Sequence, residues 1–108
     1  MAKMEERLDS IVARYNEINE EMMKPDVVSD RKTMAKLGRE QNELTPIVET
    51  YQEYKQAKSE YADAQELSKE EDKELRELGQ AEIERLEPLM QEYLDKLELL
   101  LVPKDPND

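Results

Sequence analysis

The chain has 108 residues, of which 16 are basic, 28 acidic and none histidine, so its formal net charge is −12. A chain of this length forms one domain at most, because domains typically run from ~50 to 250 residues. It contains no cysteine, which excludes disulfide scaffolds, thiolate zinc sites and cysteine nucleophiles; without histidine it also lacks the commonest general base. The excess of acidic residues argues against nonspecific binding to nucleic-acid phosphates, which requires a basic surface. It leaves open RNA binding through a few local residues.

The N-terminal segment has no apolar core of a secretory signal, and no run of ~18 apolar residues follows anywhere in the chain. We therefore expect an intracellular, cytoplasmic protein with no membrane partner.

The composition and apolar spacing favour helices throughout. There are two glycines and five prolines, and good helix formers dominate the remainder. The first stretch has apolar residues at alternating steps of four and three, which is a heptad seam. Its members are Met4, Leu8, Ile11, Tyr15, Ile18 and Met22. This seam predicts a helix over about 3–23 that ends before Pro25, because the residue preceding a proline avoids the helical region.

A second helix is predicted over about 29–66. Ser29 offers an N-cap and Asp30 an acid in the first turn. Thr45 and Pro46 leave two alternatives: Thr45 caps a new helix, or one long helix is bent there. No other turn residues flank this pair, so we favour the continuous, bent helix.

A third helix is predicted to start at a capping box formed by Ser68 and Glu71. Its seam again alternates steps of four and three. The members are Gly79, Ile83, Leu86, Met90, Tyr93, Leu97 and Leu100. Pro88 should kink this helix, and Pro103 and Pro106 should end it near residue 101.

The short connections predict antiparallel neighbours and an all-α fold, an elongated three-helix bundle. The first helix is too short to cover more than half of the second, so a slimmer, coiled-coil-like pair should project beyond it. The tip of that pair falls near residues 65–73. Residues 1–101 would form the helical domain, and residues 102–108 a truncated linker to absent domains.

No residues suggest catalysis or metal binding. The adjacent acids Glu70, Glu71 and Asp72 are typical of a solvated helix surface, since acid–base work needs carboxyls in contrasting environments within a cleft. The two glycines lie 41 positions apart, which excludes a glycine-rich phosphate loop. We expect no cofactor, no metal and no enzymatic activity of the chain itself.

The acidic charge is concentrated in the second half. Residues 1–59 contain ten basic and twelve acidic side chains, a net charge of −2, whereas residues 60–108 contain six and sixteen, a net charge of −10. One interpretation is a solvated helical surface; the other is an acidic arm that binds a basic partner.

The C-terminal segment, Leu99-Leu100-Leu101-Val102-Pro103-Lys104-Asp105-Pro106-Asn107-Asp108, resembles the end of the N-terminal domain in the family of bacterial peptide chain release factor 1. Two further patches are similar to it, Pro25-Asp26-Val27-Val28-Ser29-Asp30 and Tyr51-Gln52-Glu53-Tyr54-Lys55. The resemblance extends over the whole chain in length and helix order. Val102 is a small departure, because the family often has leucine there.

The resemblance implies a part in translation termination at the stop codons UAA and UAG. The family's Pro-x-Thr decoding motif and Gly-Gly-Gln hydrolysis motif match no position in this chain, so no catalytic residue and no stop-codon contact carry over. In the family this domain reaches the stalk base of the large ribosomal subunit. Docking would then use tip residues, namely Gln65, Glu66, Ser68, Lys69, Glu70, Glu71 and Lys73. The connection to the rest of the factor would be made by Leu99, Leu100, Leu101, Val102 and Pro103.

The main alternative is a free-standing acidic coiled-coil adaptor that binds a partner helix along its seam. An adaptor of that kind would dimerise, whereas we expect a monomer.

Overall fold

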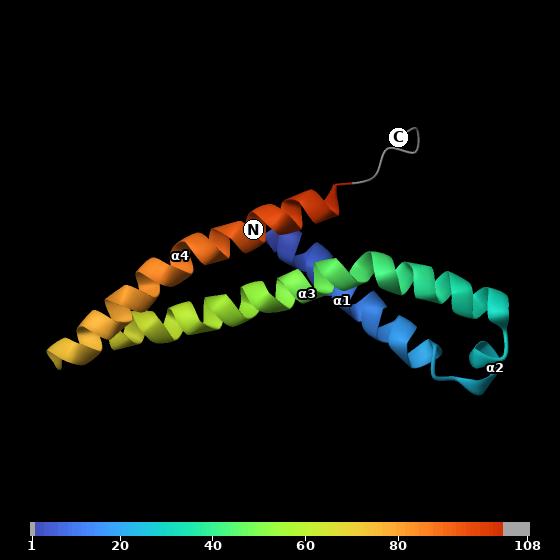
Figure 1. The fold of residues 1–108 in the computed structure, drawn as a ribbon, viewed down its shortest axis with the longest axis horizontal. Helices are drawn as coiled ribbons and strands as arrows, with labels where there is room; N and C mark the ends of the chain where they lie inside the picture. Colours follow the sequence, from blue (N-terminus) through green and yellow to red (C-terminus); the bar gives the residue numbers. More distant parts are fainter. Residues whose placement is uncertain (1, 103–108) are drawn as a thin grey trace. The chain divides into compact units, whose positions relative to one another are not determined.

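In a computed structural model, residues 2–102 are described and form four helices: α1 (Ala2–Glu21), α2 (Pro25–Val28), α3 (Arg31–Leu67) and α4 (Lys73–Leu101) (Figure 1). No strand occurs in this part of the chain, so the all-α class predicted from the sequence is confirmed. The chain divides into two compact units, Met1–Glu49 and Thr50–Asp108. The linker predicted at 102–108 lies, after Val102, outside the described residues. Over the range 2–102, no helix combines the length and apolarity that crossing a membrane requires.

In the first unit, α1 packs antiparallel to the start of α3. Asn19 accepts a hydrogen bond of 2.7 Å from Gln41, and the hydroxyls of Tyr15 and Thr45 lie 3.4 Å apart. The predicted seam of α1 is confirmed, because Leu8 and Ile18 are fully buried and its other members are half-buried.

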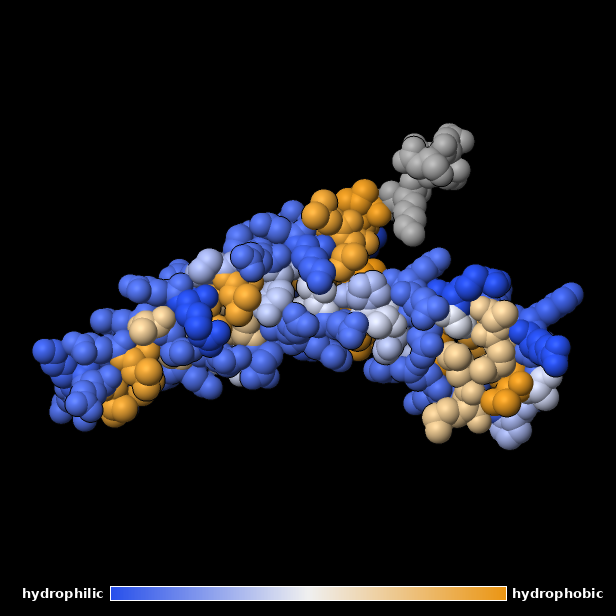
Figure 2. Space-filling view, viewed as in Figure 1, coloured by the Kyte–Doolittle hydropathy of each residue, from blue (hydrophilic) through white to orange (hydrophobic). Residues whose placement is uncertain are grey.

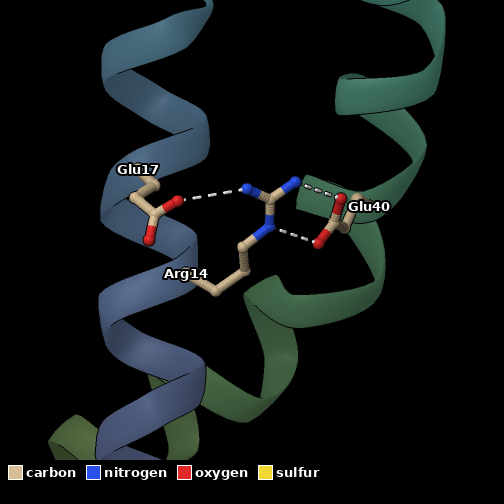
Figure 3. A network of polar contacts seen from close by, with 3 residues as sticks. All are labelled: Arg14, Glu17 and Glu40. Atoms are coloured by element: carbon tan, nitrogen blue, oxygen red, sulfur yellow. Dashed lines mark hydrogen bonds and ion pairs between the residues drawn. The ribbon is translucent and has the colours of Figure 1, made fainter.

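Hydrogen bonds from the Arg14 guanidinium join α1 to α3 in this unit (Figure 3). Arg14 donates from Nε and Nη2 to the two carboxylate oxygens of Glu40 at 2.6 and 2.8 Å, and from Nη1 to Glu17 at 3.3 Å. The hydrogen bonds from Arg14 lower the pKa of Glu40, and those to Glu40 raise the pKa of Arg14. A bidentate arginine–carboxylate pair fixes direction as well as distance, so it sets the register of α1 on α3.

The pKa of Glu40 makes the contribution of this pair depend on pH. Because that pKa is below its ordinary value of 4.5 in the folded chain, the pair stabilises above pH 4.5 and is lost as pH falls through the folded pKa. We expect Glu40→Gln to lower the melting temperature at pH 7 and to have a shrinking effect below pH 4.5. Thermal melts of wild type and variant across pH measure this. Glu43→Gln, at an exposed position of the same helix, is the matched control; an equal loss in both variants would contradict the assignment.

The connection between α1 and α3 differs from its prediction in two ways. The helix predicted to reach residue 23 ends at Glu21, and the single-turn helix α2 follows, begun by Pro25 at its first position. Ser29 was predicted to cap the second helix, and this is wrong, because Ser29 instead closes the C-terminus of α2. Asp30 caps α3, accepting from the backbone N–H of Thr33 at 3.3 Å and from its hydroxyl at 2.7 Å. These bonds lower the pKa of Asp30.

α3 runs without interruption through Pro46, which confirms the continuous alternative. The Thr45 hydroxyl donates to the carbonyl oxygen of Gln41 at 2.7 Å, four residues back within the same helix. Thr45 is thus an interior helical residue and caps nothing.

In the second unit, the rest of α3 forms an antiparallel hairpin with α4. The buried residues of α3 include small ones seven positions apart, Thr50, Ala57 and Ala64. On α4, Gly79 and Leu86 are buried, also seven apart, and Leu86 packs with the two alanines as a core cluster. Small residues at successive heptad positions let two helix backbones approach closely.

The two helix backbones lie very close together at Gly79. A Cβ atom built there would lie 2.5 Å from the backbone nitrogen of Ser68, 2.8 Å from the carbonyl oxygen of Ala64 and 2.9 Å from the carbonyl carbon of Leu67. All three are backbone atoms, so no side-chain rotation relieves the contact. Gly38, the other glycine, has nothing within 4 Å of such a Cβ.

Substituting alanine for each of the two glycines should therefore change the stability of the chain in opposite directions. Gly79→Ala should destabilise the chain by about 1–3 kcal/mol, because the overpacked hairpin end must separate. Gly38→Ala should stabilise it by up to ~1 kcal/mol through helix propensity alone. Thermal unfolding followed by circular dichroism measures both. A Gly79→Ala variant as stable as wild type would show that the helices do not approach this closely.

Candidate docking surface at the hairpin turn

The residues predicted for docking lie together where α3 turns into α4. We call residues 65–73 the hairpin tip. Gln65 and Glu66 belong to the last turn of α3, Ser68 begins the connection, and Lys73 is the first residue of α4. Ser68 is half-buried, and the other predicted docking residues are exposed.

The sequence placed the start of the last helix too early. Ser68 is not its N-cap; the Ser68 hydroxyl donates to the carbonyl oxygen of Gln65 at 2.7 Å and finishes α3. Asp72 caps α4, accepting from the backbone N–H groups of Glu74 at 2.9 Å and Leu75 at 3.4 Å. The predicted box fails because the Ser68 hydroxyl is bonded to the last turn of α3, while the carboxylate of Asp72 lies next to the first N–H groups of α4 and accepts from them.

Hydrogen bonds within the hairpin tip hold part of its backbone. The N–H groups of Ser68, Lys69 and Glu70 donate to carbonyl oxygens of the last α3 turns at 2.9–3.1 Å. From α4, Arg76 Nη1 reaches back to the carbonyl oxygens of Glu70 at 3.3 Å and Glu71 at 3.1 Å. Sequence reasoning missed both Asp72 and Arg76. Because the backbone is held internally, the exposed side chains remain available to a partner.

The surface around the hairpin tip carries a net negative charge and has exposed apolar side chains beside it. Between residues 65 and 77 there are six acidic and three basic side chains, a net charge of −3. Its ion pairs, Lys69 with Glu66 and Lys73 with Glu77, are exposed contacts of 4.0 Å, and such contacts hold side chains weakly. Leu75 and Leu78 are 40% and 53% exposed beside the turn, and Figure 2 shows apolar surface among the hydrophilic side chains at this end of the hairpin.

The residues predicted for interdomain connection end α4. As predicted, the helix stops at Leu101, and Val102 takes an extended conformation. Leu101 is buried and Leu100 half-buried, whereas Leu99 is 76% and Val102 62% exposed. Pro103 lies outside the described residues. Figure 2 shows apolar surface at this end of α4.

Across residues 2–102, no group of three or more acidic side chains is arranged to hold a metal ion. The acids Glu82, Glu84 and Glu87 lie along α4, where Glu82 pairs with Arg85 at 2.7 Å. The described hairpin end is a charged surface whose turn is held by hydrogen bonds from Arg76 and Asp72.

These features define an all-α domain that contains an antiparallel helical hairpin. The chain belongs to the PCRF domain family, which matches residues 11–108. Proteins named peptide chain release factor 1 are similar to it over 106 residues, or 97% of the chain: 44% identical in Listeria welshimeri, 43% in Listeria monocytogenes and 39% in Staphylococcus aureus. The chain spans 30% of the length of these relatives. No solved structure matches it significantly. The resemblance drawn from the C-terminal segment is thereby confirmed.

The role of Asp72 can be separated from that of Ser68. Replacing an N-cap aspartate by alanine removes the acceptor for two helix N–H groups and typically costs roughly 1 kcal/mol. We expect Asp72→Ala to lower stability by about this amount and to speed hydrogen exchange first at Glu74 and Leu75. Asp72→Asn, which keeps an acceptor, is the control and should change little. Ser68→Ala should leave exchange at α4 unchanged; if it rather than Asp72→Ala accelerates exchange there, the cap assignment is wrong.

Proposed function

We propose that this chain is the N-terminal, ribosome-docking domain of a peptide chain release factor that acts in translation termination at UAA and UAG. The observation that carries the proposal is its 39–44% identity to release factor 1 proteins over nearly the whole chain. Because the chain corresponds to 30% of their length, decoding and peptidyl-tRNA hydrolysis would belong to the remaining domains of a cytoplasmic factor. Residues 102–108 would begin the linker to them.

The part played by this domain is docking without chemistry. The hairpin tip would meet the stalk-base region of the large subunit, where ribosomal proteins are generally basic. The net charge of −3 over residues 65–77 supports this, because complementary charge accelerates association. The braced backbone supports it too, since a preordered turn loses little conformational entropy on binding.

The distance between the hairpin tip and the end of α4 also suits docking at one end and connection at the other. α4 has 29 residues, which corresponds to roughly 43 Å at ~1.5 Å per residue. Leu99 and Val102, both exposed at its far end, are suited to pack against the following domains. A continuous helix of this length would connect a contact at the tip with the body of the factor.

Charge reversal at the tip tests the proposal in the full-length factor. Glu70→Lys with Glu71→Lys should slow association with ribosomes several-fold at low salt, because it replaces attraction to a basic surface by repulsion. The backbone carbonyls of both residues keep their bonds to Arg76, so the turn should stay folded. Stopped-flow measurements of association give the rate, and raising the salt should shrink the difference.

The matched control is Glu84→Lys with Glu87→Lys, two exposed acids in the middle of α4. It changes the net charge by the same amount away from the tip. If both double variants slow association equally, the effect comes from net charge and the tip is not the docking surface. Unchanged association in the tip variant would also reject the assignment.

A further inference from the structure

The first quarter of α3, residues 31–39, has a basic face in an acidic chain. Residues 31–39 contain four cations and no acid, and all four cations are exposed. We call these four residues the basic stripe: Arg31, Lys32, Lys36 and Arg39. The net charge of −12 for the whole chain conceals this local concentration.

The basic stripe occupies one side of the helix. At ~100° per residue, its members fall within an arc of roughly 140°. Leu37, which is buried, and Gln41, which bonds to Asn19 of α1, point to the other side. The sequence therefore separates a packing side from a charged side over the same two turns.

The cations of the basic stripe are not used inside the molecule. None of the four forms an ion pair with any residue in the described part of the chain, although Lys36 lies near enough to Glu40 to assist Arg14 in lowering its pKa. Arg14, Arg85, Lys69 and Lys73, by contrast, each pair with a glutamate. Four unpaired cations on one helix face repel one another, and a bound polyanion would relieve that repulsion.

The neighbours of the cations favour a phosphate backbone over a protein surface. Between Arg31 and Arg39, the only other residue on the exposed side is Ala35, so the stripe has no aromatic or large aliphatic side chain to anchor a protein contact. It has no ring on which a base could stack either. A surface made of arginine and lysine without such side chains is suited to bind phosphates. Arginine can contact a phosphate with two parallel N–H groups.

Salt screening makes local charge decisive. At physiological ionic strength the Debye length is ~8 Å, so an anion at this face responds mainly to nearby charges. Arg31 and Arg39 are eight residues apart, or roughly 12 Å along the helix, enough to span about three phosphates of one strand.

We propose that the basic stripe binds the phosphate backbone of double-stranded RNA without reading its sequence. The inference deepens the proposed function, because it rests on that function for the source of the RNA, which is the ribosome. The domain would then use two surfaces of opposite charge, an acidic tip for protein and the basic stripe for RNA.

The test uses the isotopically labelled 108-residue chain and a short RNA duplex. In an NMR titration at low salt, amide shifts should concentrate at residues 31–39, and affinity should fall at least about tenfold between 50 and 200 mM salt. Neutralising the stripe with Arg31→Gln, Lys32→Gln, Lys36→Gln and Arg39→Gln should abolish the shifts. The double variant Lys32→Gln with Lys36→Gln should weaken binding while disturbing the fold least.

A control with the same charge change is Lys3→Gln, Lys55→Gln, Lys58→Gln and Lys96→Gln, four exposed lysines outside both the basic stripe and the hairpin tip, which should bind as wild type does. Three results would overturn the proposal: no shifts at residues 31–39, equal loss in the control, or equal binding of polyglutamate, which would indicate an acidic protein partner. The titration contains no ribosome, so its failure is distinct from failure of the tip reversal.

Discussion

Backbone contact at Gly79 is the constraint on which the hairpin depends. Two helices meet there with no room for a Cβ atom, since the nearest atoms of the facing segment are backbone at 2.5–2.9 Å. Ala64 and Ala57 keep the approach close along α3, and Leu86 fills the space that opens between them. The contact lies where α3 ends, because the backbone of Ser68, the first residue of the connection, is packed against Gly79. Asp72 caps α4 four residues later, and residues 69–71 between them are exposed.

The apolar pattern predicted the helices better than their ends. A heptad seam needs only sequence spacing, so Leu8, Ile18, Leu86 and Leu97 were assigned to the core correctly. Caps depend on competition between neighbouring candidates. Ser29 competes with Asp30, and Ser68 with Asp72; in both places the carboxylate, two acceptor oxygens on a short stem, takes the helix N–H groups. α2 has four residues, too few for any periodic signal.

The position of the hairpin turn could be predicted from the sequence, whereas the hydrogen bonds that hold the turn could not. An antiparallel pair of helices must turn somewhere, and the spacing located that turn near residues 65–73. Its bracing by Arg76 was not predictable, because an arginine donating to carbonyl oxygens five and six residues earlier leaves no repeating pattern. The ion pair between Arg14 and Glu40 was hidden for the same reason, since 26 residues separate the partners. The family, in contrast, was evident from a short segment of proline and leucine residues.

Net charge is a poor guide to what this chain binds. A helix distributes its residues over several faces. A face three turns long extends roughly 16 Å, which is more than the Debye length of ~8 Å over which salt screens a charge. In the two proposals above, the acids of the hairpin tip and the cations of the basic stripe would act on different partners, although their charges offset one another in any sum over the chain. A binding surface made of RNA and basic protein presents negative charge to a basic helix face and positive charge to an acidic one. A domain that keeps its two charges on separate helix faces can contact each of them, and one with the same composition but mixed faces would pair its charges internally and contact neither.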